Sequence, residues 1–255
     1  MENISLVLVD LDGTLFHNDK SISEYSKQII KKIQEKGIQF GICTSRAYIN
    51  AYKFLEGIKP DVFISNGGGM VRIGEEKIYS CQFSVDEVRT LIEAAFRICG
   101  PEIIMSADNE EGLYSNSKEE LGDKFWTYID FLEFRAPAMK ICIQSLDKEK
   151  VSQIAASIGQ DKIDYLPFSD IPWYKMTLKE ATKEKAIEAL CSKLNIQAKE
   201  VAAFGDDFSD IGMLKLCGYG IAMDNAIDEV KKIASGTCLS NEEDGVAHWL
   251  EEKLL

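Results

Sequence analysis

The sequence predicts an α/β protein whose doubly wound, mostly parallel core sheet is interrupted by an inserted α+β domain. Short apolar runs alternate with amphipathic helical stretches near both ends of the chain, which is the order expected of a parallel sheet covered by helices. Between these two regions, strands and helices follow one another without strict alternation. That order is typical of an α+β unit with an antiparallel sheet.

The first region predicts a strand–helix–strand–helix–strand unit. Residues 6–9 are four aliphatic residues in a row and predict a strand buried on both faces. The helix expected over 23–36 carries isoleucines on one face and ends at Gly37. The other elements expected here are a strand at 38–43, a short helix after it, a strand at 61–65 and a hairpin over 69–80.

The middle and last regions differ in the order of their expected helices and strands. In the middle we expect helices at 85–98 and 148–158, strands at 103–105, 140–144, 163–168 and 174–178, and an acidic loop over 106–122. In the last region we expect helices at 183–194, 210–216, 226–234 and 246–252, with strands at 201–204, 219–223 and 236–240. The predicted core therefore comprises residues 1–80 and 179–255, and the inserted domain comprises residues 81–178.

Charge and composition narrow the function. The 255-residue chain is 45% hydrophobic, so it can bury a sizeable core, yet it holds no apolar run near the ~18 residues of a membrane span. Its net charge of −13 argues against a nucleic-acid partner, because phosphate backbones require a basic surface. A small phosphorylated substrate stays compatible with that charge, since distant charges are screened beyond ~8–10 Å.

Cysteine usage and the N-terminal residues indicate a location. The seven cysteines are an odd number without a Cys-x-x-Cys pair, which predicts reduced thiols and neither a disulfide framework nor a zinc site. The N-terminal residues lack the basic and apolar segments of a secretory signal. We therefore expect a cytoplasmic protein; the sequence gives no oligomeric state.

Polar side chains follow three of the predicted buried strands. They are Asp10 and Asp12, then Thr44, Ser45 and Arg46, then Asp206 and Asp207. The carboxyl ends of parallel strands share one edge of a sheet, so these groups should meet there. Two like charges ~4 Å apart cost about 4 kcal/mol at an effective dielectric constant near 20. An all-oxygen set beside a phosphate suits Mg²⁺, which would offset that repulsion. The alternative, that these residues cap helices, suits Ser209 and Asp210 but not Asp10.

Four ordered motifs resemble those of the haloacid dehalogenase superfamily. They are Asp10-Leu11-Asp12-Gly13-Thr14, Thr44, Lys183, and the run from Gly205 to Asp210. The large insertion, Asn66-Gly67 and the C-terminal runs 222–226 and 243–247 resemble the Cof-type sugar-phosphatase branch. The resemblance implies a Rossmann-like phosphatase core with an inserted α+β cap that sets substrate specificity.

The resemblance also implies roles. Asp10 would be the nucleophile that forms a phosphoaspartate, and Asp12 the general acid and then base. Mg²⁺ would take a carboxylate oxygen of Asp10, the backbone carbonyl of Asp12 and the carboxylate of Asp206, while Asp210 would orient the metal's waters. The groups expected to bind phosphate or substrate are Thr44, Lys183, the Leu11 N–H, Ser45, Arg46 and Ser209. Ser209 stands where this branch usually has Asn.

The resulting functional prediction is a Mg²⁺-dependent phosphatase of small phosphorylated metabolites, with sugar phosphates as the class that the resemblance indicates. One alternative is a phosphomutase acting on a sugar phosphate. Another is a phospho-accepting signalling module, although receivers have no second acid placed for a leaving group. His17 and His248 are expected at the surface, so a Ser-His-Asp hydrolase is not predicted.

Overall fold

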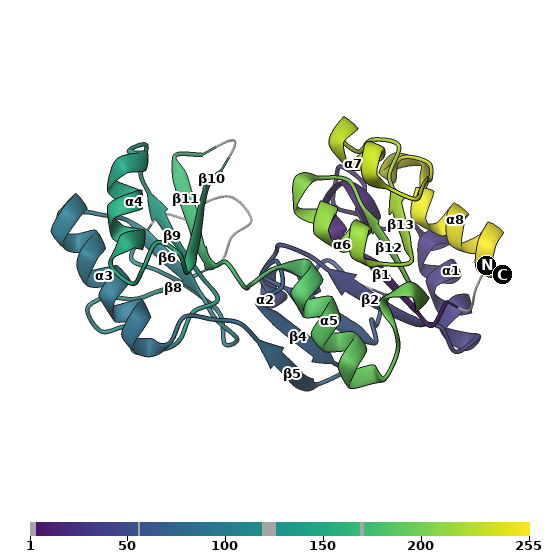
Figure 1. Cartoon of the computed structure of the whole chain (residues 1–255), viewed down its shortest axis with the longest axis horizontal. Coiled ribbons are helices and arrows are strands. Elements are labelled where there is room, and N and C mark those ends of the chain that lie inside the picture. Colours follow the sequence, from purple (N-terminus) through teal and green to yellow (C-terminus); the bar gives the residue numbers. More distant parts are fainter. Residues whose placement is uncertain (1–3, 56, 119–125, 169–170) are drawn as a thin grey trace. The chain divides into compact units, whose positions relative to one another are not determined.

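The computed structural model describes residues 4–55, 57–118, 126–168 and 171–255. The chain divides into two compact units (Figure 1), which we call the first unit, Met1–Ser80 with Thr182–Leu255, and the second unit, Cys81–Ala181. The first unit carries a largely parallel α/β sheet and the second a largely antiparallel sheet with helices, which confirms the predicted fold class. Among the helices that the structure describes, none is long and apolar enough to cross a membrane.

The sheet of the first unit has the strand order β14-β13-β12-β1-β2-β3-β4-β5. Its strands are β1 Leu6–Val9, β2 Gln39–Cys43, β3 Val62–Ser65, β4 Met70–Ile73, β5 Glu76–Ser80, β12 Val201–Gly205, β13 Tyr219–Ala222 and β14 Gly236–Thr237. Pairing is parallel from β14 to β3, while β4 and β5 add the antiparallel hairpin that the sequence predicts.

Helices cover both faces of this sheet. They are α1 Glu24–Glu35, α2 Tyr48–Tyr52, α5 Lys183–Leu194, α6 Ile211–Leu216, α7 Asp228–Ile233 and α8 Gly245–Leu254. The chain leaves β1 toward β2 on one side and leaves β12 toward β13 on the other. Because such crossovers are right-handed, α1 and α6 lie on opposite faces. The point between β1 and β12 is therefore a topological switch point, where open α/β sheets hold their ligands.

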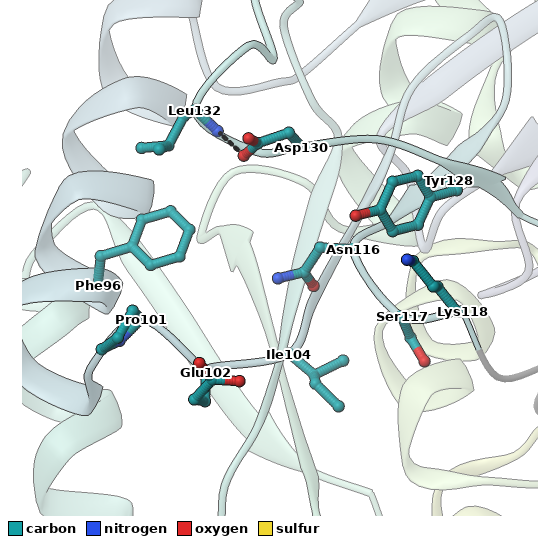
Figure 2. A pocket seen from close by; sticks show the side chains of 10 residues that line it. All are labelled: Phe96, Pro101, Glu102, Ile104, Asn116, Ser117, Lys118, Tyr128, Asp130 and Leu132. Carbon is teal, nitrogen blue, oxygen red and sulfur yellow. Dashed lines mark hydrogen bonds between the residues drawn. The ribbon is translucent and has the colours of Figure 1, made fainter.

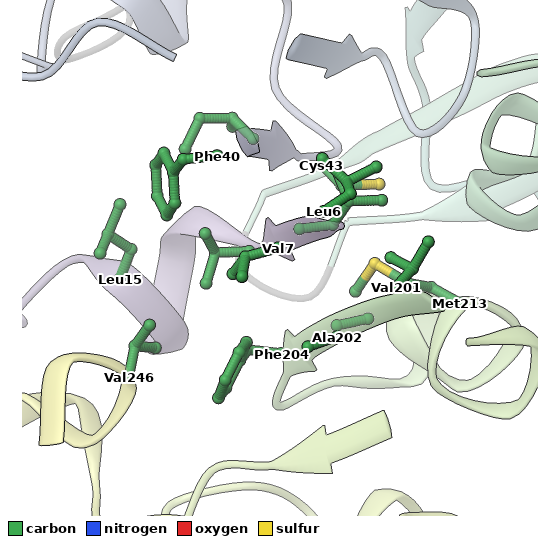
Figure 3. Packing of buried hydrophobic residues seen from close by; sticks show 14 of the residues in the cluster. Leu6, Val7, Leu15, Phe40, Cys43, Val201, Ala202, Phe204, Met213 and Val246 are labelled. Carbon is green, nitrogen blue, oxygen red and sulfur yellow. The ribbon is translucent and has the colours of Figure 1, made fainter. Parts of the chain in front are cut away.

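The centre of this sheet packs into an apolar core. All four side chains of β1 are fully buried, as their unbroken aliphatic run predicts. They pack with residues of the neighbouring strands β2 and β12, with Met213 of α6 and with Val246 of α8 (Figure 3). Burying one such aliphatic side chain contributes roughly 1.5–3 kcal/mol. This packing gives the ends of β1 and β12 a rigid support.

The second unit is built on a six-stranded sheet of order β10-β11-β9-β6-β7-β8. Its strands are β6 Met105–Asp108, β7 Leu113–Ser115, β8 Thr127–Tyr128, β9 Lys140–Gln144, β10 Ile163–Pro167 and β11 Trp173–Leu178; its helices are α3 Val85–Cys99 and α4 Lys148–Ala156. All pairs are antiparallel except β7–β8. The residues of α3 and α4 that face the sheet form a second apolar core.

The expectation of a loop over 106–122 is wrong for much of its length. Residues 106–108 belong to β6 and residues 113–115 form β7, while 119–122 lie outside the described residues. The side chain of Asn109 accepts hydrogen bonds from the N–H groups of Glu111 and Gly112, which closes the hairpin turn. The strand β6 was not predicted over these residues because Asp108 is charged, and a charged residue does not indicate a buried strand. In the structure the Asp108 carboxylate is buried in an ion pair with Lys140 of β9.

Candidate active site

The turn that follows β1 carries the first group of predicted residues. Asp10 extends the strand, since its N–H donates to the Phe204 carbonyl of β12 at 3.1 Å. The chain then turns over Leu11–Leu15, and Gly13 adopts a φ of +73°, a left-handed conformation that favours glycine. Asp10 and Asp12 thus lie at the carboxyl edge of the sheet, beside the end of β12.

Three carboxylates meet at this edge. Oxygen atoms of Asp10, Asp206 and Asp210 all lie within 4.8 Å of one another. Gly13 makes the approach possible, because a Cβ atom there would lie 2.2 Å from Oδ2 of Asp206. The Thr14 hydroxyl donates to Oδ1 of Asp206 at 2.9 Å and fixes that carboxylate.

One buried ammonium group faces the cluster. Nζ of Lys183 donates to Oδ1 of Asp10 at 2.8 Å and to Oδ1 of Asp210 at 2.6 Å, and its side chain is 1% exposed. Burial lowers the Lys183 pKa on its own, but the two aspartates raise it above its usual value, so the amine stays charged.

A single ammonium cannot neutralise three carboxylates. Burial raises the pKa of Asp10 to about 7, and the positive charge of Lys183 only partly offsets that rise, because Asp210 and Asp206 also raise the pKa. Burial likewise raises the pKa of Asp206 to about 6. The cluster carries surplus negative charge in a desolvated place, which favours a bound cation.

Asp210 uses both of its carboxylate oxygens in hydrogen bonds within the chain. Its Oδ2 accepts from the backbone N–H groups of Asp206 at 3.0 Å and Asp207 at 3.1 Å, while its Oδ1 accepts from Lys183. Gly205 leaves room for it, because a Cβ atom there would lie 2.5 Å from the Asp210 side chain. The predicted helix start at Asp210 is instead a short turn, Phe208–Asp210, followed by α6.

These donors fit Mg²⁺. The set is all oxygen, and Asp10 and Asp206 each have one carboxylate oxygen beyond the hydrogen bonds described above. Asp210 has both oxygens engaged, so it is suited to orient bound water rather than to touch the ion. The glycine at position 13 keeps the space beside Asp206 free of side-chain carbon.

Asp12 lies in a separate ionic contact. Arg46 donates to both of its oxygens, from Nε and an Nη atom, each at 2.6 Å, and Lys20 donates to Oδ1 at 2.8 Å. The Arg46 guanidinium lies 5.6 Å and 5.1 Å from the ring centroids of Phe16 and Phe54. Burial opposes ionisation of Asp12, but the hydrogen bonds from Arg46 and Lys20 lower its pKa below the usual value. Asp12 is thus a carboxylate here.

The loop after β2 is tied to the loop after β3. Thr44 is buried, and its hydroxyl accepts from the Arg46 N–H at 3.2 Å. The N–H groups of Asn66 and Gly67 donate to the carbonyls of Arg46 and Thr44, at 2.8 Å and 3.0 Å. Asn66-Gly67, which the sequence linked to the family, thereby positions the loop that carries Thr44 and Arg46.

The remaining predicted residues are less engaged. Leu11 lies at the start of the turn with its side chain buried, while Ser45 and Ser209 are exposed. Within the described residues, no hydrogen bond joins either serine hydroxyl to the three carboxylates. The substrate-binding roles of these three residues stay predictions.

Sequence reasoning missed two side chains that touch the predicted acids. Thr14 stands inside the motif Asp10–Thr14, two residues after Asp12, and this position is a usable signal for its contact with Asp206. Lys20 gave no signal, because it belongs to an irregular segment and reaches Asp12 through a left-handed backbone conformation with φ of 69°.

The histidines also make polar contacts. His17 Nε2 lies 3.2 Å from Oδ1 of Asp244, and His248 Nδ1 lies 3.3 Å from the Tyr25 hydroxyl. His248 is exposed and His17 is partly exposed. Neither contact involves the three-carboxylate cluster.

The second unit has a pocket of its own, of about 750 Å³ (Figure 2). Its polar groups largely serve the local backbone. The Asn116 side chain accepts from the Met105 N–H and donates to the Ile103 carbonyl, and Asp130 accepts from the Leu132 N–H. None of the predicted site residues lines this pocket.

The chain is similar to known proteins over nearly its whole length. The model of a family described as haloacid dehalogenase-like hydrolase matches residues 7–250. The 5-amino-6-(5-phospho-D-ribitylamino)uracil phosphatase YitU of Bacillus subtilis (strain 168) is 26% identical, over 97% of this chain and 96% of that protein. Phosphatase YwpJ of the same organism is 26% identical, over 98% of this chain and 100% of that protein.

Solved structures share the fold along the whole chain. A haloacid dehalogenase-like hydrolase from Bacteroides thetaiotaomicron is 25% identical with a TM-score of 0.86, covering 98% of this chain and 99% of that one. TM0651 from Thermotoga maritima is 22% identical with a TM-score of 0.84, covering 99% and 98%. Since the family model spans almost the entire sequence, the chain belongs to the haloacid dehalogenase-like hydrolases.

Proposed function

We propose that the protein is a Mg²⁺-dependent phosphatase that hydrolyses small phosphorylated metabolites through a phosphoaspartate on Asp10. The observation that carries the proposal is the surplus of carboxylates around Lys183 at the switch point of the sheet. The similarity to proteins named as phosphatases, which extends over nearly their whole length, supports the same reaction class.

The cation would be held by carboxylate oxygens of Asp10 and Asp206 together with the backbone carbonyl of Asp12. Asp210 would orient its waters, since its own oxygens already accept hydrogen bonds. When bound, Mg²⁺ neutralises phosphate charge and fixes the phosphoryl group for attack.

The chain's own groups would carry out the transfer. An oxygen of Asp10 attacks phosphorus, and the bond from phosphorus to the leaving oxygen breaks while Asp12 supplies a proton to that oxygen. Asp12 then takes a proton from water, which attacks phosphorus, releases inorganic phosphate and restores Asp10. Lys183, Thr44 and the Leu11 N–H would hold the phosphoryl oxygens.

The contact between Asp12 and Arg46 sets a condition on this proposal. A carboxylate cannot donate a proton, and Arg46 and Lys20 keep Asp12 ionised in the free protein. We expect the anionic substrate to compete for Arg46, which weakens the contact and lets Asp12 hold a proton. Arg46 would thus bind substrate, with Ser45 and Ser209 as further contacts at the exposed rim.

Sugar phosphates are the proposed substrate class, on the resemblance to the Cof-type branch. The name of YitU refers to a phosphorylated ribitylamino compound, which is a polyol phosphate, and supports a phosphorylated polyhydroxy substrate here.

A phosphate-release screen with purified protein tests the proposal. We expect release from sugar phosphates in Mg²⁺, no release in EDTA, and recovery when Mg²⁺ is returned. Full activity in EDTA would remove the metal from the mechanism. Activity that depends on a sugar bisphosphate primer, with phosphate returned to the sugar, would identify a phosphomutase instead.

A further inference from the structure

Asn225 and Asn241 form hydrogen bonds with the turn that follows β1. The Asn225 side chain donates from Nδ2 to the Gly13 carbonyl at 2.8 Å, and its Oδ1 accepts from the Asn241 N–H at 2.9 Å. The Asn241 side chain in turn donates to the Phe16 carbonyl at 2.9 Å. The turn is therefore held at its middle and at its end by residues more than 200 positions away.

The segment that contains Asn225 also holds the end of β12. The Met223 N–H donates to the Gly205 carbonyl at 3.2 Å, and the Ile227 N–H donates to the Asp206 carbonyl at 3.1 Å. Residues 223–227 thus contact both loops that carry the carboxylates. We call this segment the brace.

The brace contacts the two loops close to the point where Gly13 approaches the Asp206 carboxylate. Gly13 lies against the Asp206 carboxylate and separates Asp12 from Thr14, whose hydroxyl fixes Asp206. A shift of the Gly13 peptide would move Asp12 and Thr14 together relative to Asp206. Of the three hydrogen bonds described above between the brace and these loops, the one from Asn225 is made by a side chain and the other two by backbone N–H groups.

We propose that Asn225 is a positioning residue that sets the distance between the nucleophile turn and Asp206, and through it the geometry of the cation site. The inference rests on the proposed function for its kinetic consequence. Both halves of the carboxamide have defined partners, so the side chain must present nitrogen to Gly13 and oxygen to Asn241.

The chemistry of this site supplies a discriminating pair of variants. Asn225→Ala removes both hydrogen bonds. Asn225→Asp keeps the acceptor for Asn241 but places a carboxylate oxygen against the Gly13 carbonyl, where two acceptors repel. A purely structural role predicts that Asp is the milder change, whereas positioning of the turn predicts that Asp is the more harmful.

The experiment measures kcat, KM and the half-saturating Mg²⁺ concentration for both variants. Asp224→Asn is the matched control, because Asp224 is the adjacent residue, is exposed as Asn225 is, and has its carboxylate 3.9 Å from Lys231. We expect kcat to fall and the Mg²⁺ requirement to rise by roughly 10–100-fold in Asn225→Asp, less in Asn225→Ala, with KM and Tm close to the control. Wild-type kcat and Mg²⁺ dependence in Asn225→Asp would overturn the proposal, as would a greater loss in Asn225→Ala.

Amide hydrogen exchange separates this inference from the proposed function. In metal-free protein, residues 11–16 should exchange faster in Asn225→Asp than in Asp224→Asn, with the exchange of β1 unchanged. If no phosphomonoester is hydrolysed by the wild type, the proposed function fails while exchange still tests the brace. Equal exchange in the two variants would refute the brace whatever the activity.

Discussion

Both units bury a lysine against an aspartate, but the charge balance differs. In the second unit, Lys140 of β9 lies 2.8 Å from Asp108, its direct partner across the β6–β9 pair, and both side chains are largely buried. In the first unit, Lys183 faces Asp10 and Asp210, with Asp206 close by. One contact is balanced and the other leaves surplus negative charge.

Charge balance distinguishes a buried ionic contact that stabilises the fold from one that serves chemistry. A one-to-one pair, supplied by neighbouring strands, has nothing further to bind. A cluster with more carboxylates than cations, supplied by β1, α5 and the end of β12, is stabilised by an added cation. We therefore expect the Asp108–Lys140 pair to act on stability and the Asp10 cluster to act on turnover.

The largest expected effect is on activity. Asp10→Asn should lower kcat on the order of 10³-fold or more, because it removes the proposed nucleophile. The free energy of unfolding of the metal-free protein should not fall, since one of three crowded charges is removed. Asp108→Asn is the counterpart in the second unit and should leave far more turnover. An equal loss of kcat in the two variants, measured by phosphate release, would break the comparison.

Next comes the stability of the balanced pair. Lys140→Met should lower the free energy of unfolding by about 3–5 kcal/mol, because it leaves the Asp108 carboxylate buried without its partner. Adding Asp108→Leu should recover most of that loss, as apolar replacement of a buried pair is often close to neutral. Denaturant unfolding of the single and double variants measures both values. A single variant as stable as wild type would show that the pair contributes nothing.

The surplus charge itself predicts a response to metal. Mg²⁺ at 100 times its Kd should stabilise the wild type by about 2.7 kcal/mol, seen as a rise in Tm. Asp206→Asn should abolish most of that rise, whereas Lys140→Met, which alters the balanced pair, should keep it. Ca²⁺-free buffers with matched ionic strength exclude a general salt effect. A Tm that ignores Mg²⁺ in the wild type would contradict the cation site.

The smallest expected effect concerns the N-terminal cap of helix α3 in the second unit. Ser84 accepts from the Glu87 N–H at the start of α3, and Glu87 accepts from the Ser84 N–H. Ser84→Ala should cost about 1 kcal/mol. The hydrogen bond from Ser84 lowers the pKa of Glu87 below its ordinary 4.5, so its contribution is present above that pH and is lost as pH falls through the lower value.

Glu87→Gln measures the contribution of the Glu87 charge to the free energy of unfolding. Its destabilisation relative to wild type, followed by denaturant unfolding from pH 7 downward, should shrink once the pH drops below about 4.5. A difference that stays constant across this range would show that the charge of Glu87 contributes nothing to the cap.

Much of the fold could be predicted because its signals are local. The bounds of β1, β9 and α5 agree with the expected ranges, since each has an unbroken apolar or periodic pattern. The two-residue strand β8 and the strands within the acidic stretch could not be predicted, because exposed or paired polar residues carry no such pattern.

The site divides in the same way. Asp10 and Asp206 were expected to meet because parallel strands end at one edge, and their oxygens do lie together. The contacts of Lys20 with Asp12 and of Asn225 with Gly13 had no basis in spacing or residue type. Both depend on loops whose paths follow from packing.

A doubly wound core, an inserted domain and acids at the ends of buried strands could all be predicted from the amino-acid sequence, because apolar periodicity and strand order depend on neighbouring residues. The number of carboxylates that share one ammonium group, and the distant side chains that hold them, became known from the folded structure. Charge balance depends on distances between elements far apart in the chain, and the folded packing alone sets those distances.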